Sequence, residues 1–76
     1  MTDLAQKVLN ITVPYLGPAS KVFLERQTKH HMNGVLFDDL EKRHLPDLSH
    51  WVQISAGLLI DKTLARELSE KISILK

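Results

Sequence analysis

The stretch Tyr15-Leu16-Gly17-Pro18-Ala19 decides the fold, because one helical pattern ends in it and another begins. Glycine readily ends a helix, since it adopts left-handed backbone angles without a steric cost. Proline is tolerated at the first position of a helix, where its missing N–H would have no partner anyway. The stretch therefore predicts a sharp turn between two helices.

Further start and stop signals mark the ends of the other helices. Asp3 is expected to cap the first helix, and Pro14 is expected to end or kink it. Asn33 and Gly34 both tolerate left-handed backbone angles and are expected to end the second helix. Asp61 is expected to cap the last one.

Apolar residues recur at helical spacing between these signals, and no segment alternates apolar and polar residues as a strand would. Val22 and Phe23 share one face of the second helix, and Leu64, Leu68 and Ile72 form a stripe along the last. We therefore expect an all-α fold, a compact bundle of four to five short helices. These helices are expected to cover about residues 4–14, 18–32, 36–45, 46–59 and 62–75.

Length and composition limit what the chain can be. Its 76 residues suffice for one core, so we expect a single helical domain over residues 1–76. The absence of cysteine excludes disulfides, cysteine ligands to zinc and thiol catalysis. Ten Lys and Arg residues against nine Asp and Glu residues give a formal net charge of +1, which is too balanced to indicate a nucleic-acid partner.

The sequence also carries no sign of a membrane span or of secretion. No apolar run approaches the roughly 18 residues that a membrane-spanning helix needs. The first residues lack the charged and then apolar pattern of a secretory signal. We expect a cytoplasmic protein.

The segment 46–59 has apolar residues on nearly every side when it is drawn as a helix. A helix that is apolar all round must be buried in something, and a 76-residue monomer offers little interior. We therefore expect part of this surface to contact a protein partner or a second copy, as in a homodimer. This predicts a non-catalytic protein–protein interaction or regulatory domain, with no enzymatic activity, cofactor or metal. The expected interaction residues are Leu48, Trp51, Ile54, Leu58 and Leu59.

Nucleic-acid or phosphate binding is an alternative function. It would use the basic residues on or near the second and third helices, and a basic cluster of this kind suits phosphate groups. Nucleic acid is the less expected partner, because no helix rich in Arg, Lys, Asn and Gln follows a tight turn as a recognition helix would. The basic residues concerned are Lys21, Arg26, Lys29, His30, His31, Lys42, Arg43 and His44.

A metal-dependent enzyme built on histidines is a third possibility. It would use His30, His31, His44 and His50. Adjacent histidines point about 100° apart on a helix, so one metal ion cannot easily take both. No His-x-x-x-His or His-Glu-x-x-His pattern occurs in the sequence.

Two stretches of the chain resemble a known family. Leu16–Arg26 (LGPASKVFLER) is similar to the Gly-Pro turn of a small all-helical domain found at the C-terminal end of bacterial signalling proteins, including Ser/Thr kinases and regulators. Phe37–Asp47 (FDDLEKRHLPD) is similar to that domain's second segment. Ser20 stands where that domain has a small apolar residue. The resemblance implies an accessory, non-catalytic role in signalling and carries over no catalytic residue.

Overall fold

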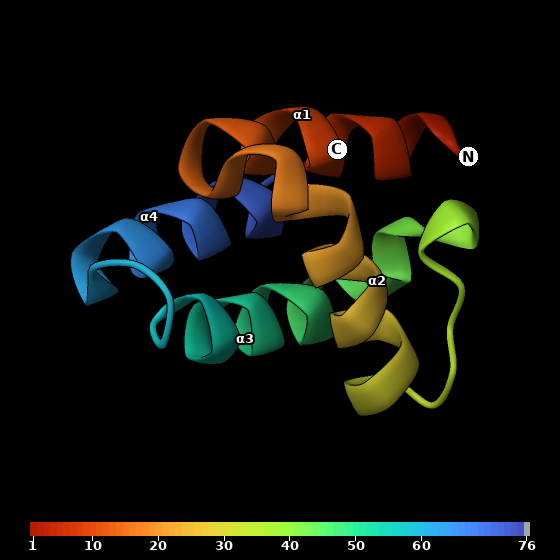
Figure 1. The fold of residues 1–76 in the computed structure, drawn as a ribbon. Coiled ribbons are helices and arrows are strands. Elements are labelled where there is room, and N and C mark those ends of the chain that lie inside the picture. Colours follow the sequence, from red (N-terminus) through yellow and green to blue (C-terminus); the bar gives the residue numbers. More distant parts are fainter. Residues whose placement is uncertain (76) are drawn as a thin grey trace.

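The computed structural model describes residues 1–75, and within them four α-helices follow one another with no β-strand (Figure 1). The predicted all-α class is therefore confirmed. The last residue of the expected domain, residue 76, lies outside the described part. The helices are α1 (Asp3–Leu16), α2 (Ser20–His31), α3 (Leu45–Ala56) and α4 (Lys62–Ser73), and single 3-10 turns form η1 (Gly17–Ala19), η2 (Phe37–Asp39) and η3 (Lys42–His44).

The helices surround one hydrophobic core. Helix α1 packs on α2 and α4, and α3 packs on the same two helices, so the helix contacts form a closed ring. In Figure 1, α1 lies along the top with α4 and then α3 below it, and α2 descends beside them from the level of α1 to below that of α3. The Cα radius of gyration is 10.8 Å, close to the roughly 11 Å of a compact folded chain of this length. The core side chains are Ala5, Val8, Phe23, Leu24, Met32, Phe37, Leu40, Leu45, Leu48, Val52, Ala56, Ala65, Leu68 and Ile72.

Helix α1 differs from the expected helix at both ends. Its N-cap is Thr2, whose Oγ1 accepts a hydrogen bond from the Ala5 N–H at 3.1 Å. Asp3 lies in the first turn, where a carboxylate interacts favourably with the helix dipole. Pro14 does not end the helix, which continues beyond it. Pro14 deprives the Asn10 carbonyl of its helical donor, but Asn10 is exposed and water can supply a replacement.

Gly17 and Pro18 form the predicted turn. Gly17 has a φ of 64°, and its N–H donates to the Val13 carbonyl at the end of α1. Pro18 lies in the 3-10 turn η1, so α2 begins at Ser20, two residues later than expected. The buried Ser20 hydroxyl donates to the Gly17 carbonyl at 2.7 Å and closes this turn.

Helix α2 ends where the sequence predicts. Asn33 and Gly34 both have positive φ, 57° and 75°, and together they lead the chain away from the helix. The last turn of α2 carries Lys29, His30 and His31, at the end of the helix dipole where positive charge is favourable.

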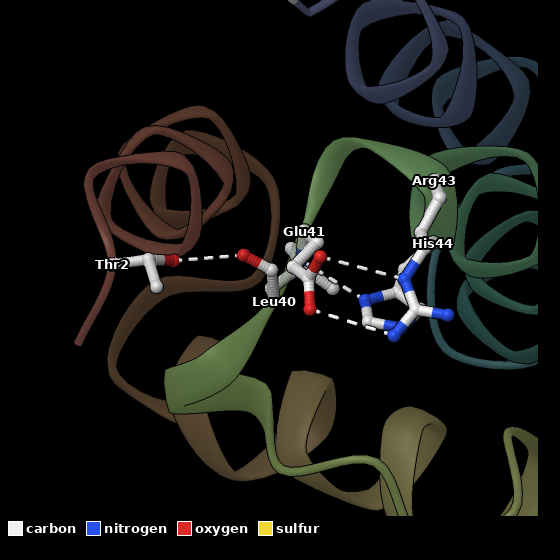
Figure 2. A network of polar contacts seen from close by, with 5 residues as sticks. All are labelled: Thr2, Leu40, Glu41, Arg43 and His44. Carbon is white, nitrogen blue, oxygen red and sulfur yellow. Dashed lines mark hydrogen bonds and ion pairs between the residues drawn. The ribbon is translucent and has the colours of Figure 1, made fainter.

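The helix expected over residues 36–45 does not form, and two 3-10 turns take its place. Leu40, between these turns, has an extended backbone with ψ of 131°. The Thr2 N–H donates to the Asp38 carbonyl at 2.9 Å. Thr2 Oγ1 donates to the Leu40 carbonyl, also at 2.9 Å (Figure 2). These bonds occupy carbonyl groups that a helix would use internally, while Phe37 and Leu40 are buried in the core. The bundle therefore has four α-helices, and a fifth was wrongly expected here.

Helices α3 and α4 form a helical hairpin. Pro46 lies in the first turn of α3, and the helix ends at Ala56, three residues earlier than expected, with Gly57 as its C-cap. Helix α4 begins after Asp61, whose carboxylate accepts the Thr63 N–H at 2.7 Å, so the predicted cap is confirmed. The early end of α3 leaves residues 57–61 as a separate connection between α3 and α4, and Leu58 and Leu59 lie in it.

Candidate functional site

Leu58 and Leu59, in the connection between α3 and α4, are turned towards solvent. They are 84% and 67% exposed. Their backbone is nevertheless fixed, because the Leu58 N–H donates to the Ser55 carbonyl at 3.2 Å and the Leu59 N–H to the Ala56 carbonyl at 2.9 Å. The turn thus presents two large apolar side chains on a hydrogen-bonded backbone.

These leucines form one wall of a groove whose other wall is α2. Val22 and Phe23 contribute the apolar part of the α2 wall. The groove encloses about 280 Å³, which is at the lower limit of small-molecule sites, about 300–1,000 Å³. It is therefore better suited to side chains of another protein than to a substrate. Its lining residues are Ala19, Val22, Phe23, Arg26, Gln27, Ser55, Leu58 and Leu59.

A partly buried polar contact fixes the two walls of the groove against each other. The Ser55 hydroxyl in α3 donates to Gln27 Oε1 in α2 at 2.8 Å. The Gln27 amide nitrogen in turn donates to the Phe23 carbonyl at 3.3 Å, and Gln27 is only 5% exposed. Because a buried amide with both ends paired holds one orientation, the groove is formed in the absence of a partner.

Leu58 also borders a second hollow, which lies between α3 and α4. This hollow has a volume of about 430 Å³. Because Leu58 lines both depressions, they lie side by side, and we call them together the leucine surface. Arg26 in the groove and Lys62 in the second hollow are the permanently charged residues of this lining, and both are positive. The second hollow is lined by His50, Gln53, Ile54, Gly57, Leu58 and Lys62.

The structure separates the five predicted interaction residues into three groups. Leu58, Leu59 and Ile54 are exposed and belong to the leucine surface. Trp51 is half-buried and packs against the core. Leu48 is completely buried in the core, so its place among the expected surface residues is corrected: it faces inward from α3 and cannot reach a partner.

Sequence reasoning missed the contribution of α2 to this surface. Val22 is 52% exposed, whereas Phe23 is 8% exposed. Neighbouring residues of a helix point about 100° apart, so only one of the two can point directly at the core. That spacing indicated that one of the two would lie nearer the surface, but not which one.

The four histidines do not gather around one point. His31 stacks on the Trp51 indole, with ring centroids 4.2 Å apart and planes 12° from parallel. His50 meets the same indole edge-on, at 5.2 Å and 76°. His30 is exposed, and His44 is part of η3. Across residues 1–75, no three or more His, Cys, Asp or Glu side chains are placed to hold a metal ion.

Two of the basic residues considered for phosphate binding act within their own turn. The Glu41 N–H donates to His44 Nδ1 at 2.9 Å, so this ring nitrogen is the acceptor of a backbone hydrogen bond (Figure 2). Arg43 Nε lies 3.4 Å from the Glu41 carboxylate in an exposed ion pair. Figure 2 shows both side chains directed at Glu41. These contacts stabilise η3, although the exposed ion pair contributes little.

A separate polar cluster joins α1 to α4. The Tyr15 hydroxyl donates to Glu67 Oε1 at 2.8 Å, and Lys71 Nζ lies 3.5 Å from the same oxygen. The hydrogen bond from Tyr15, helped by Lys71, lowers the pKa of the Glu67 carboxyl. Tyr15 and then Glu67 raise the pKa of the Lys71 ammonium group, which lies 5.1 Å from the centre of the Tyr15 ring. The cluster is exposed and lines neither depression of the leucine surface.

Comparison with known protein families, curated proteins and solved structures found no match. No protein-family model matches the chain, and neither a curated protein nor a solved structure is significantly similar to it. The resemblance to a helical domain of signalling proteins therefore stays a prediction. Within residues 1–75, no helix combines the length and the apolar character needed to cross a membrane.

Proposed function

We propose that this chain is a non-catalytic protein–protein interaction domain that docks a partner on the leucine surface. The observation that carries the proposal is the exposure of Leu58 and Leu59, 84% and 67%, side by side on a hydrogen-bonded turn. Single exposed apolar residues are ordinary, but adjacent ones that line a formed depression are typical of interaction sites.

The fold itself does not need these side chains. The core is complete without Leu58 and Leu59, and each is held through its backbone N–H. Burying a leucine side chain contributes about 1.5–3 kcal/mol, which this monomer leaves unused at both positions. A partner would gain that contribution without rearranging the core.

The resemblance of Leu16–Arg26 and Phe37–Asp47 to a domain of bacterial signalling proteins supports a regulatory role. The accessory, non-catalytic role that the resemblance implies is compatible with docking of another protein, and we propose that this docking occurs in the cytoplasm. Arg26 and Val22 belong both to the first of these stretches and to the groove.

The test is affinity capture from the source cells with three baits. The first is the unmodified chain, and the second carries Leu58→Ser and Leu59→Ser together. The third carries Ile74→Ser, a matched control because Ile74 is 73% exposed and lines neither depression of the leucine surface. Thermal unfolding followed by circular dichroism verifies that all three are folded.

We expect proteins that are retained by the unmodified chain and by the control but lost from the double variant. A double variant that is folded and still retains the same proteins would show that docking does not use the leucine surface.

A further inference from the structure

We infer that the partner segment on the leucine surface is an acidic amphipathic helix rather than a second copy of this chain. The inference rests on the proposed function and names the chemistry of the partner. It is drawn from the charges and the shape of the two adjoining depressions.

The charge of the surface points to an acidic partner. Each depression has one permanently charged residue in its lining, Arg26 in the groove and Lys62 in the second hollow, and both are cationic. Two carboxylates adjoin these cations in the sequence. Asp61, beside Lys62, already accepts a hydrogen bond from the Thr63 N–H as the cap of α4, and Glu25, beside Arg26, is exposed and lines neither depression. A ligand that carries carboxylates beside its apolar face would complement both cations.

The same charges disfavour self-association through this surface. A two-fold dimer places the same patch on both sides of the interface. The cationic rim with Arg26 and Lys62 would then face an identical cationic rim, which costs affinity. The leucine surface is therefore apolar enough to dock a protein but unsuited to its own copy.

The shape of the surface fits a helix. Leu58 stands between two depressions, so a ligand that straddles it needs two apolar side chains on one face. A helix supplies such a pair at positions i and i+3 or i+4. Carboxylates on its flanks would then lie near Arg26 at one end and near Lys62 at the other.

The experiment uses two designed, covalently stapled helical peptides that share the same leucines at i, i+4 and i+7. One carries Glu at all flanking positions, and the other carries Lys there. Binding is measured by fluorescence anisotropy and located by amide chemical shifts of the 15N-labelled protein. The protein is used unmodified, with Leu58→Ser and Leu59→Ser together, and with Arg26→Glu and Lys62→Glu together.

We expect the acidic peptide to bind the unmodified protein at least about tenfold more tightly than the basic one, because two exposed ion pairs replace two like-charge contacts. Arg26→Glu with Lys62→Glu should reverse the preference, and Leu58→Ser with Leu59→Ser should remove binding of both peptides. The amide signals of residues 54–59 should shift with the acidic peptide, and the preference should weaken as salt is raised.

Three results would overturn the inference. Equal binding of both peptides, or tighter binding of the basic one, would show that Arg26 and Lys62 do not select the partner. Failure of the acidic peptide to shift the amide signals of Leu58 and Leu59 would exclude an amphipathic helix of this type. A dimer in sedimentation that Leu58→Ser with Leu59→Ser dissociates would identify a second copy as the occupant. None of these results contradicts the proposed function. That proposal fails if the variant with Leu58→Ser and Leu59→Ser still retains the same proteins in the affinity capture.

Discussion

The imidazole of His31 lies flat against the indole of Trp51, with ring centroids 4.2 Å apart and an interplanar angle of 12°. His31 is the last residue of α2, and Trp51 lies in the middle of α3. The stack therefore joins the far end of α2 to the α3–α4 hairpin, one helical turn away from the hydrogen bond between Gln27 and Ser55.

Replacing His31 should loosen this junction. We expect His31→Ala to lower the free energy of unfolding by about 0.5–1.5 kcal/mol, the usual contribution of a stacked aromatic pair. His30→Ala is the matched control, since His30 is exposed on the same turn, and it should change the stability by less than about 0.5 kcal/mol. Urea denaturation followed by circular dichroism measures both, and equal effects of the two substitutions would mean that the stack does not contribute.

Truncation of Leu48 should destabilise the fold strongly and truncation of Leu58 hardly at all, although both were expected at the interface. Leu48→Ala removes a completely buried side chain and should cost about 2–5 kcal/mol, enough to unfold much of a domain this small. Leu58→Ala removes a side chain that is 84% exposed and should change stability by less than about 0.5 kcal/mol. Thermal melts of the two variants test this directly, and a large loss of stability in Leu58→Ala would mean that the turn is part of the core.

The Thr2 hydroxyl forms hydrogen bonds with both α1 and the segment after η2, so its removal should destabilise both. Its Oγ1 accepts from the Ala5 N–H at the start of α1 and donates to the Leu40 carbonyl. We expect Thr2→Ala to cost about 1–2 kcal/mol, because a cap and a long-range hydrogen bond disappear together. Thr2→Ser keeps the hydroxyl and should retain most of the stability in denaturant titrations. Amide hydrogen exchange at Leu40 and Glu41 should become faster in Thr2→Ala but not in Thr2→Ser. Unchanged exchange in Thr2→Ala would mean that the hydrogen bond from Thr2 does not hold this segment.

The contact between Tyr15 and Glu67 should appear as a pH dependence. The Tyr15 hydroxyl holds the pKa of Glu67 below its ordinary value of 4.5 in the folded protein. A lowered folded-state pKa adds stability at pH values above the unfolded-state pKa, and this stability is lost as the pH falls through the folded-state value. Tyr15→Phe should therefore raise the pKa of Glu67 towards 4.5. The variant should then lose less stability than the unmodified protein as the pH falls through the folded-state pKa of Glu67.

An NMR titration that follows the side-chain carboxyl carbon of Glu67, in the unmodified protein and in Tyr15→Phe, measures the change in its pKa. Glu67→Gln is the control background, in which Tyr15→Phe should no longer alter the pH dependence of unfolding. An unchanged titration of Glu67 in Tyr15→Phe would mean that the hydrogen bond does not persist in solution.

Local signals in the sequence predicted much of the fold. The turn at Gly17 and Pro18, the stop at Asn33 and Gly34 and the cap at Asp61 are all confirmed, because each depends on the conformational preferences of neighbouring residues. The stripe of the last helix was correct at Leu68 and Ile72, which are buried. Its first member is replaced by the adjacent Ala65, and Leu64 is 44% exposed, because spacing alone does not distinguish i+3 from i+4.

The segment 36–45 was mispredicted for a different reason. Its apolar spacing is compatible with a helix, but its backbone is held by Thr2, 38 positions away from Leu40 in the sequence. Periodicity carries no information about so distant a donor. The contacts of Arg43 and His44 with Glu41 then stabilise the second 3-10 turn, η3.

The candidate surface could be predicted only in part. Ile54, Leu58 and Leu59 were expected as interaction residues because of the excess of apolar residues in the segment 46–59. All three are exposed, and their contact with a partner stays a prediction. The end of α3 at Ala56, with Gly57 as its C-cap, decides which apolar residues face inward, and this end lies three residues before the expected one. The contribution of Val22 depends on how α2 crosses α3, which is a tertiary property.

The position of Trp51 gives the molecule an intrinsic optical reporter. It is the sole tryptophan of the chain, it contacts the His31 and His50 rings, and it precedes the groove residue Ser55 by one helical turn. Emission from this indole is therefore sensitive to the joining of two helices and to events at the neighbouring groove. Ligand titrations and stopped-flow refolding can be followed with the unlabelled protein, and no dye is needed that would itself adhere to exposed leucines.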